Sequence, residues 1–197
     1  MKLFRLFGNE ILLGTLIAIL SVFTALSSYL GAMADSEQNK FEILGMRQLN
    51  DGNVSYLEAN QTWIQDDGNY DNWYINSDTN PDVAEYYEGN FTEELAAAIE
   101  RNGPDEYPMD EEYEELLYED ATDLFDESET NFDLAAEWDE RGDQLQLVML
   151  LMALGLTFAA WASLLKDESN LRPVFGFFSI AMFVIGLVTY LAVPVVG

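Results

Sequence analysis

Apolar and polar positions divide the chain into three apolar runs and one long polar segment. The runs cover residues 11–34, 145–165 and 173–196, and none of them contains Asp, Glu, Lys or Arg. A helix needs about 20 residues to cross a hydrocarbon core of about 30 Å. Each run is therefore predicted to form a transmembrane helix.

Small residues recur at every third or fourth position of the first run, which is the spacing of one helix face. Small side chains let two membrane helices approach closely. Beyond the first run, in the polar segment, larger residues continue at the same spacing of three or four. A single helix is therefore predicted to leave the membrane and to pack along this stripe as in a coiled coil. The predicted packing residues are Gly14, Ala18, Ser21, Ala25, Ser28, Ala32, Met46, Leu49, Tyr56 and Trp63, and Gly45, Gly52 and Ala59 lie beside them at every seventh position.

Two turn-forming tetrapeptides interrupt this predicted helix, at Asn50–Asn53 and at Asp66–Asn69. Each contains a glycine, which costs a helix interior about 1 kcal/mol relative to alanine. We expect the helix to continue through the first tetrapeptide and to end or kink at the second.

The first run also ends on Ala32-Met33-Ala34, a pattern that signal peptidases cleave. However, signal peptides have apolar cores of about 7–15 residues, and this run is longer. We expect the run to be kept as a membrane span.

A second long helix is predicted from residue 110, with packing positions that include Leu117, Leu124 and Trp138. At about 1.5 Å per residue, segments 35–75 and 110–143 would reach about 60 Å and about 50 Å. Between them, residues 76–109 have cap and stop signals for two short helices, one closed by Gly89 and one by Gly103.

The predicted fold is an all-α membrane protein with three transmembrane helices, an antiparallel helical extracytoplasmic stalk and a small helical cap. Its predicted parts are 1–34 (first span), 35–143 (acidic domain, with the cap at about 76–109) and 144–197 (two-span hairpin).

Charge is distributed unevenly and predicts an orientation. The net charge is -28 in 197 residues, and residues 35–143 hold 33 Asp and Glu but four Lys and Arg. Lys2 and Arg5 precede the first run, and Lys166 and Arg172 separate the second from the third. Because positively charged loops stay in the cytoplasm, the N-terminus is predicted to be inside and residues 35–143 outside.

Cys and His are both absent from the sequence. This excludes disulfides, the usual zinc sites and nucleophile–base pairs that use Cys or His, and we expect no catalytic residues and no enzyme. The acidic segment would repel nucleic acid. A channel or transporter normally has ionisable residues within its spans, which these runs lack.

An alternative function is extracytoplasmic sensing of a ligand or of calcium. Asp67, Asn69, Asp71 and Asp78 stand at positions 1, 3, 5 and 12 of an EF-hand-like count. The pattern departs from an EF-hand because Asn72 replaces the glycine and the twelfth residue is Asp rather than Glu. No other cofactor is expected.

Three sequons for N-glycosylation begin at Asn53, Asn60 and Asn90. Asn53 and Asn60 lie on the predicted packing stripe, where a glycan would not fit. We therefore expect that only Asn90 is compatible with glycosylation.

Two stretches carry a resemblance to other proteins: YLEANQTWIQDDGNYDNWY at 56–74 and ERGDQLQLVMLLMALGL at 140–156. Their arrangement resembles uncharacterised prokaryotic three-span membrane proteins with an N-terminal span, a helical extracytoplasmic segment and a C-terminal helical hairpin. The resemblance implies this fold and a prokaryotic cell membrane, and it implies no site residues.

These observations together favour a non-enzymatic, membrane-anchored scaffold or an accessory subunit of a larger assembly. The expected partners are membrane lipid and either further copies of this chain in a homo-oligomer or other membrane-protein subunits.

Overall fold

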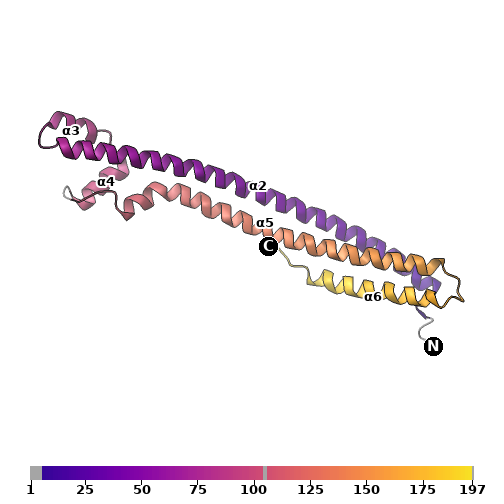
Figure 1. Ribbon diagram of the computed structural model, residues 1–197. Coiled ribbons are helices and arrows are strands. Elements are labelled where there is room, and N and C mark those ends of the chain that lie inside the picture. The colour runs from indigo at the N-terminus through magenta and orange to yellow at the C-terminus, as the bar shows by residue number, and fades with distance from the viewer. Residues whose placement is uncertain (1–5, 104–105, 197) are drawn as a thin grey trace. The chain divides into compact units, whose positions relative to one another are not determined.

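The computed structural model describes residues 6–103 and 106–196, so Lys2 and Arg5 lie outside the described residues. Of the described residues, 86% are helical and none is in a strand. Their five helices are α2 (Glu10–Asn76), α3 (Pro81–Glu88), α4 (Glu93–Asn102), α5 (Glu111–Leu164) and α6 (Leu171–Ala192) (Figure 1). The predicted all-helical fold class is confirmed.

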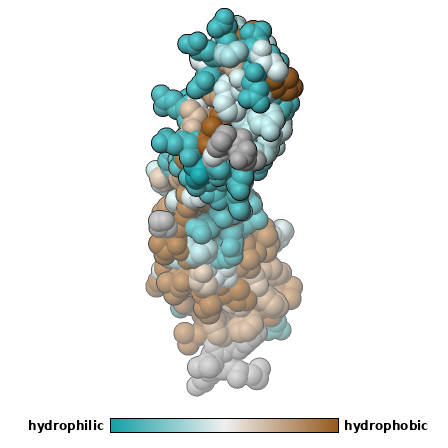
Figure 2. Space-filling view, turned by 90° about the vertical axis from the view of Figure 1, so that its left-hand side faces the viewer, coloured by the Kyte–Doolittle hydropathy of each residue, from teal (hydrophilic) through white to brown (hydrophobic). Residues whose placement is uncertain are grey.

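Helices α2, α5 and α6 are long and apolar enough to cross a membrane, with mean hydropathies of 2.1–2.2 over their most apolar windows. The prediction of three such helices is confirmed. Within these 18-residue windows, only 22%, 28% and 17% of the residues are buried inside the chain. Most of their apolar surface is therefore exposed, as the brown residues in Figure 2 illustrate, and it requires lipid or another protein as its surroundings.

Helix α2 runs without interruption from Glu10 to Asn76. The predicted continuity through Asn50–Asn53 is confirmed, but the break expected at Asp66–Asn69 is wrong. Asp and Asn favour turns because their side chains bond to the nearby backbone. Here Asp66 and Asn69 bond instead to residues on other elements, Thr92, Tyr113 and Asn90, so they do not compete with the helix.

The two short helices end where the sequence predicts, before Gly89 and Gly103, but α4 begins at Glu93, three residues after Asn90, where the sequence pattern starts. Helix α3 starts on Pro81, directly after Asn80, and stops before Gly89. Helix α4 begins after Thr92, whose side-chain oxygen accepts a hydrogen bond from the Leu95 N–H, and it stops before Gly103. Gly103 has a φ of 82°, a left-handed conformation that glycine adopts at little cost.

The chain divides into two compact units, each of which includes part of α2 and part of α5. The membrane unit comprises Met1–Glu42 and Phe132–Gly197, and the hairpin unit comprises Ile43–Asn131. The three apolar runs, 11–34, 145–165 and 173–196, belong to the membrane unit, and α3 and α4 belong to the hairpin unit.

Side chains from all three spans form the core of the membrane unit. Leu16 and Leu20 of α2 cluster with Val148 and Met152 of α5, and Phe183 of α6 packs against them. Glycines allow the close contacts around this core. A Cβ atom added at Gly155 would lie 3.2 Å from Leu20 and from Met182, and one added at Gly176 would overlap the Phe7 carbonyl group.

In the hairpin unit, α2 and α5 pack as a helical hairpin. The Ser128 hydroxyl donates to the Gly45 carbonyl oxygen at 2.9 Å, and the Tyr118 hydroxyl donates to Asn60 Oδ1 at 2.8 Å. Gly52 lies so close to Phe125 that an added Cβ would be 2.9 Å from the ring. Ala59 and Ala121 are also buried, so small side chains allow α2 and α5 to lie close together.

The buried face of α2 is one residue away from the predicted stripe. Buried positions include Leu13, Leu20 and Ser27 in the membrane unit, and Gly45, Gly52 and Ala59 in the hairpin unit. One residue turns a helix by about 100°, so the predicted stripe lies on a neighbouring face. Trp63 is half-buried, but the other predicted α2 positions are exposed within the chain: Gly14, Ala18, Ser21, Ala25, Ser28, Ala32, Met46, Leu49 and Tyr56.

The size of the side chains does not identify the contact face of α2, because two adjacent faces of this helix both carry small residues. In the hairpin unit, the face that contacts α5 has the small residues at every seventh position, and the larger Met46, Leu49 and Tyr56 are exposed. The expectation that larger residues would take up the contact in water is therefore wrong for this chain. Glycine and alanine on α2 leave room for Phe125 and Leu124 of α5.

Two glycines of α2 provide a test of this packing. Gly52→Leu is expected to lower the free energy of unfolding by about 1–3 kcal/mol, because the new side chain would overfill the contact with Phe125. Gly68→Leu is the matched control, since no atom lies within 4 Å of a Cβ added there. It should stabilise the helix by about 0.5–1 kcal/mol. Thermal unfolding of the full chain in mild detergent, followed by circular dichroism, measures both. Equal shifts in the two variants would contradict the packing.

Candidate functional site

A buried carboxylate joins three helices of the hairpin unit. Asp66 of α2 is 1% exposed. Its Oδ1 accepts the backbone N–H of Thr92 at 3.3 Å, and its Oδ2 accepts the Thr92 hydroxyl in a short hydrogen bond. The Tyr113 hydroxyl of α5 also donates to Oδ2, at 2.9 Å. A buried carboxylate is stable only when donors satisfy its oxygens, and here three donors do so.

Apolar side chains surround this carboxylate. Tyr70, Leu95, Ala98, Met109 and Tyr113 form the core of the cap, by which we mean α3, α4, residues 106–110 and the parts of α2 and α5 that they contact. Leu117, one of the predicted packing residues, is partly buried against this core. The cap therefore has its own hydrophobic cluster with Asp66 beside it.

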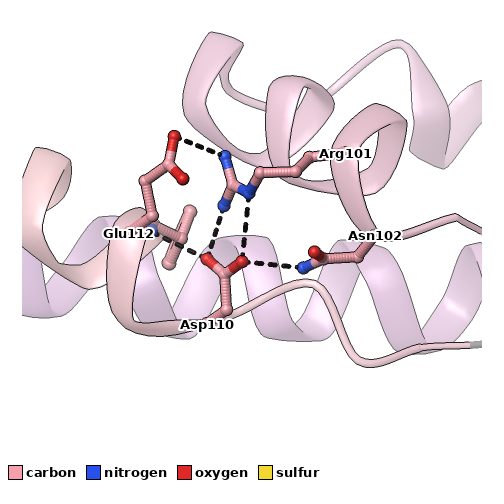
Figure 3. A network of polar contacts seen from close by, with 5 residues as sticks. Arg101, Asn102, Asp110 and Glu112 are labelled. Carbon is pink, nitrogen blue, oxygen red and sulfur yellow. Dashed lines mark hydrogen bonds and ion pairs between the residues drawn. The ribbon is translucent and has the colours of Figure 1, made fainter.

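A second polar network closes the cap where α4 leads into α5 (Figure 3). Asp110 Oδ1 accepts from the Arg101 guanidinium at 2.5 Å, and Oδ2 accepts from Arg101 Nε at 3.1 Å and from the Asn102 amide at 2.8 Å. Glu112 pairs with the same guanidinium at 3.0 Å. Asp110 Oδ1 also accepts the Tyr113 N–H at 2.9 Å, so Asp110 is the N-cap of α5.

These contacts shift the ionisation of the pair. The hydrogen bonds from Arg101 and then from Asn102 hold the pKa of Asp110 well below its ordinary value. The same hydrogen bond to Asp110 raises the pKa of Arg101. Both groups therefore stay charged at neutral pH, and the network is an ion pair with a structural role in closing the cap.

Two tyrosines of the cap have phenols that resist ionisation. Burial, together with the hydrogen bond to Asp66, raises the pKa of Tyr113 far above its ordinary value. Tyr107 donates to Asp67 Oδ1 at 2.7 Å, and partial desolvation followed by this bond raises its pKa as well. Each phenol donates to a carboxylate, so loss of its proton would place two negative charges side by side.

The residues of the predicted calcium loop lie on or just after helix α2. Asp67, Asn69 and Asp71 are helical, and Asp78 follows the helix end. Residues two apart on a helix do not face each other. Asp67 is engaged by Tyr107, and the Asn69 amide donates to the Asn90 carbonyl at 3.1 Å. Within residues 6–103 and 106–196, no three acidic side chains are placed to hold a metal ion. The calcium site stays a prediction.

The predicted packing residues of α5 are all partly buried. Leu117 joins the cap core, and Leu124 lies 3.3 Å from a Cβ added at Gly52. In the membrane unit, Trp138 is covered by the Arg141 guanidinium at 5.6 Å from the ring centre. Arg141 also donates to the Pro194 carbonyl at 2.7 Å, which ties the segment that follows α6 to α5.

Arg172 is a buried arginine at the start of α6. It is 6% exposed, forms an ion pair with Asp167, and donates to the Leu165 carbonyl at 3.2 Å. The sequence reveals this residue only as a positive charge in a short loop. The structure shows that it also holds the connection between α5 and α6 in place.

Sequence reasoning missed the role of Asp66, which it treated as part of a turn. A signal was present, because Asp66 is the next member of the seven-residue series formed by Gly45, Gly52 and Ala59. A carboxylate at a buried heptad position predicts a specific polar contact.

No family model, no curated protein and no solved structure matches this chain. The resemblance to prokaryotic three-span proteins therefore stays a prediction.

Removal of the Asp66 carboxylate tests the polar centre of the cap. Asp66→Ala is expected to lower the free energy of unfolding by about 2–4 kcal/mol, because it leaves buried donors of Thr92 and Tyr113 without an acceptor. Asp71→Ala is the matched control, since Asp71 is exposed on the same helix, and it should change stability little. Chemical unfolding of the full chain in detergent, followed by tryptophan fluorescence, reports the difference. Equal losses in both variants would contradict the role of Asp66.

The raised pKa values of Tyr107 and Tyr113 predict a loss of stability at alkaline pH. A group whose pKa is higher in the folded state stabilises the fold below its ordinary pKa and loses this contribution as the pH rises. For tyrosine the loss begins at about pH 10. Tyr113→Phe, which removes the hydroxyl but keeps the ring, should make stability less sensitive to pH above this value. Unfolding midpoints measured from about pH 8 to about pH 11, a range that brackets the ordinary pKa of tyrosine, provide the measurement. An unchanged slope in Tyr113→Phe would contradict it.

Proposed function

We propose that this chain is a non-enzymatic, membrane-anchored scaffold or an accessory subunit of a larger membrane assembly. In this proposal α2, α5 and α6 span a prokaryotic cell membrane. The parts of α2 and α5 in the hairpin unit form an antiparallel extracytoplasmic stalk that ends in the cap. The acidic segment, residues 35–143, lies outside, and the N-terminus lies inside.

One observation carries the proposal: the small-residue face of α2 is left free by the chain itself. The membrane unit builds its core from the neighbouring face, with Leu16 and Leu20. The free face carries six small residues at helix-packing spacing and is exposed along its whole length: Gly14, Ala18, Ser21, Ala25, Ser28 and Ala32. Lipid tails gain little from small side chains, whereas a second helix gains close packing.

A hollow of about 260 Å³ lies beside this face, lined by Ala18, Ile19, Val22 and Phe23. All four of its lining side chains are apolar, so it suits an apolar side chain of a neighbouring transmembrane helix. The occupant that we propose is a span of another membrane subunit, either a second copy of this chain or a different protein.

The hairpin unit supports the scaffold role. Contacts pair low-numbered residues of α2 with high-numbered residues of α5, from Gly45 with Ser128 to Asp66 with Tyr113. This order supports an antiparallel stalk. The cap at its end is held by the buried Asp66 and by the network of Asp110, so it presents a fixed acidic surface. Such a surface would attract cations or a basic partner.

The orientation is supported by the basic residues that lie at the ends of the spans. Lys166 and Arg172 flank the short loop between α5 and α6, and Arg172 is fixed there by Asp167. Thirty-three acidic residues in segment 35–143 are compatible with an outside location, because acidic residues hardly affect translocation.

Substitutions at two neighbouring positions of α2 test the proposed assembly. Native mass spectrometry in mild detergent is expected to show the wild-type protein in a particle heavier than the 22.3 kDa chain. Ala25→Leu should weaken this assembly at least about tenfold, equivalent to about 1.4 kcal/mol, because it fills the close-packing face. Leu26→Phe adds bulk to the adjoining face of large exposed residues, so it should leave the assembly intact. A strictly monomeric wild-type particle without any partner would refute the proposal.

A further inference from the structure

The three glycosylation sequons lie in different backbone environments. Asn53 and Asn60 are inside helix α2, whereas Asn90 lies in the turn between α3 and α4. Asn60 is partly buried and accepts the Tyr118 hydroxyl at 2.8 Å. Asn53 is exposed, so the expectation that it lies on the helix contact is wrong; its buried neighbour is Gly52. Acceptor asparagines lie in surface loops, and among these three only Asn90 meets this condition.

The folded structure around Asn90 is compatible with an attached glycan. Thr92, the third residue of the sequon, is extended, with φ of -69° and ψ of 165°. The Asn90 amide donates to the Tyr86 carbonyl at 2.6 Å, and an asparagine that carries a glycan keeps one N–H for such a bond. In the folded cap the Thr92 hydroxyl is engaged by Asp66. The transfer must therefore occur before the cap closes, as it would during export of the chain.

A neutral groove lies next to Asn90. Its volume is about 540 Å³, and no charged side chain is among the residues that line it: Ile64, Gln65, Gly68, Asn69, Asn72, Tyr86, Tyr87 and Asn90. This is unusual in a segment with 33 acidic residues. A groove of uncharged amides and aromatic rings favours a neutral, polar ligand over an ion.

The side chains of the groove are arranged to receive hydroxyl groups. The Asn69 and Asn72 amide nitrogens donate to the carbonyls of Asn90 and Gly68. Each amide oxygen is thereby left as an acceptor. Tyr86 is 69% exposed and offers a ring face together with a hydroxyl. Sugars present both C–H faces and hydroxyl donors, which match these groups.

We propose that Asn90 is N-glycosylated and that the first sugar of its glycan packs in this groove. The inference rests on the outside location of residues 35–143 in the proposed function. The donor is an oligosaccharide linked through phosphate to a membrane lipid. A bond forms between Asn90 Nδ2 and C1 of the sugar while the C1–oxygen bond to the lipid phosphate breaks. The phosphate leaves with the electron pair, and the amide loses one proton to a base of the transferase.

Peptide mass spectrometry of the full chain, purified from cells that naturally produce it, tests the modification. The peptide with Asn90 is expected to be heavier by a whole number of sugar residues. Asn90→Gln should abolish this increment, whereas Asn53→Gln and Asn60→Gln, which remove the other two sequons, should keep it. A glycan found on Asn53 or Asn60 but not on Asn90 would overturn the inference.

A labelling experiment separates this inference from the proposed orientation. The sequence has no cysteine, so Ser77→Cys and Glu168→Cys, both at exposed positions, each create a single reactive thiol. A membrane-impermeant maleimide should label Ser77→Cys in intact cells and Glu168→Cys only after permeabilisation. If Ser77→Cys is labelled but Asn90 is unmodified, the glycan is wrong and the orientation stands. If Ser77→Cys is labelled only after permeabilisation, the orientation fails and the glycan inference fails with it.

The groove is tested by stability. The glycosylated protein should unfold at a higher temperature than Asn90→Gln, because the first sugar adds contacts to α2 and α3. Tyr86→Ala should retain the glycan but lose this difference, when compared with the double variant Tyr86→Ala/Asn90→Gln. Ile75→Ala, which is exposed outside the groove, should leave the difference intact. A glycan that stabilises Tyr86→Ala as strongly as the wild-type would show that the sugar does not occupy the groove.

Discussion

Close approach of helices α2 and α5 is the constraint on which both units depend. In the hairpin unit Gly45, Gly52 and Ala59 supply the small side chains, and a Cβ atom at Gly52 would meet Phe125 at 2.9 Å. In the membrane unit, one added at Gly142 would lie 2.8 Å from the Asp35 carboxylate. Glycine destabilises an isolated helix. These positions are therefore best explained by packing, which compensates for the lower helix propensity.

Hydrogen bonding gives the cap its specificity. Apolar side chains alone would hold α4 against α2 and α5 in several similar arrangements, because the hydrophobic effect is not directional. Asp66 requires donors in defined positions, and Thr92 at the N-cap of α4 and Tyr113 of α5 supply them. Asp110 fixes the start of α5 in the same way through Arg101 and Tyr113. These two carboxylates are part of the framework, unlike the many acidic residues on the surface.

The proposed scaffold, the orientation and the glycan at Asn90 form one consistent description. A chain that exposes most of its apolar helical surface needs lipid or another protein around that surface. The acidic side chains of residues 35–143 would repel other acidic surfaces. A glycan in the neutral groove would add a polar cover to a part of this segment whose lining residues carry no charge. In this proposal the groove and the small-residue face of α2 are separate surfaces, one for a sugar and one for a neighbouring helix.

The sequence by itself determined the helical class, the three apolar helices, the positions where α3 and α4 end and the contact face of α5. These features follow from local rules: hydropathy over about 20 residues, cap and stop residues, and a seven-residue repeat in which Leu117, Leu124 and Trp138 contrast with acidic neighbours. Only the tertiary structure decided which face of α2 is buried, because two adjacent faces carry small residues and the choice depends on the partner side chains of α5. It also decided that Asp66 lies in a helix, since a local preference for a turn is overcome when distant donors satisfy the carboxylate.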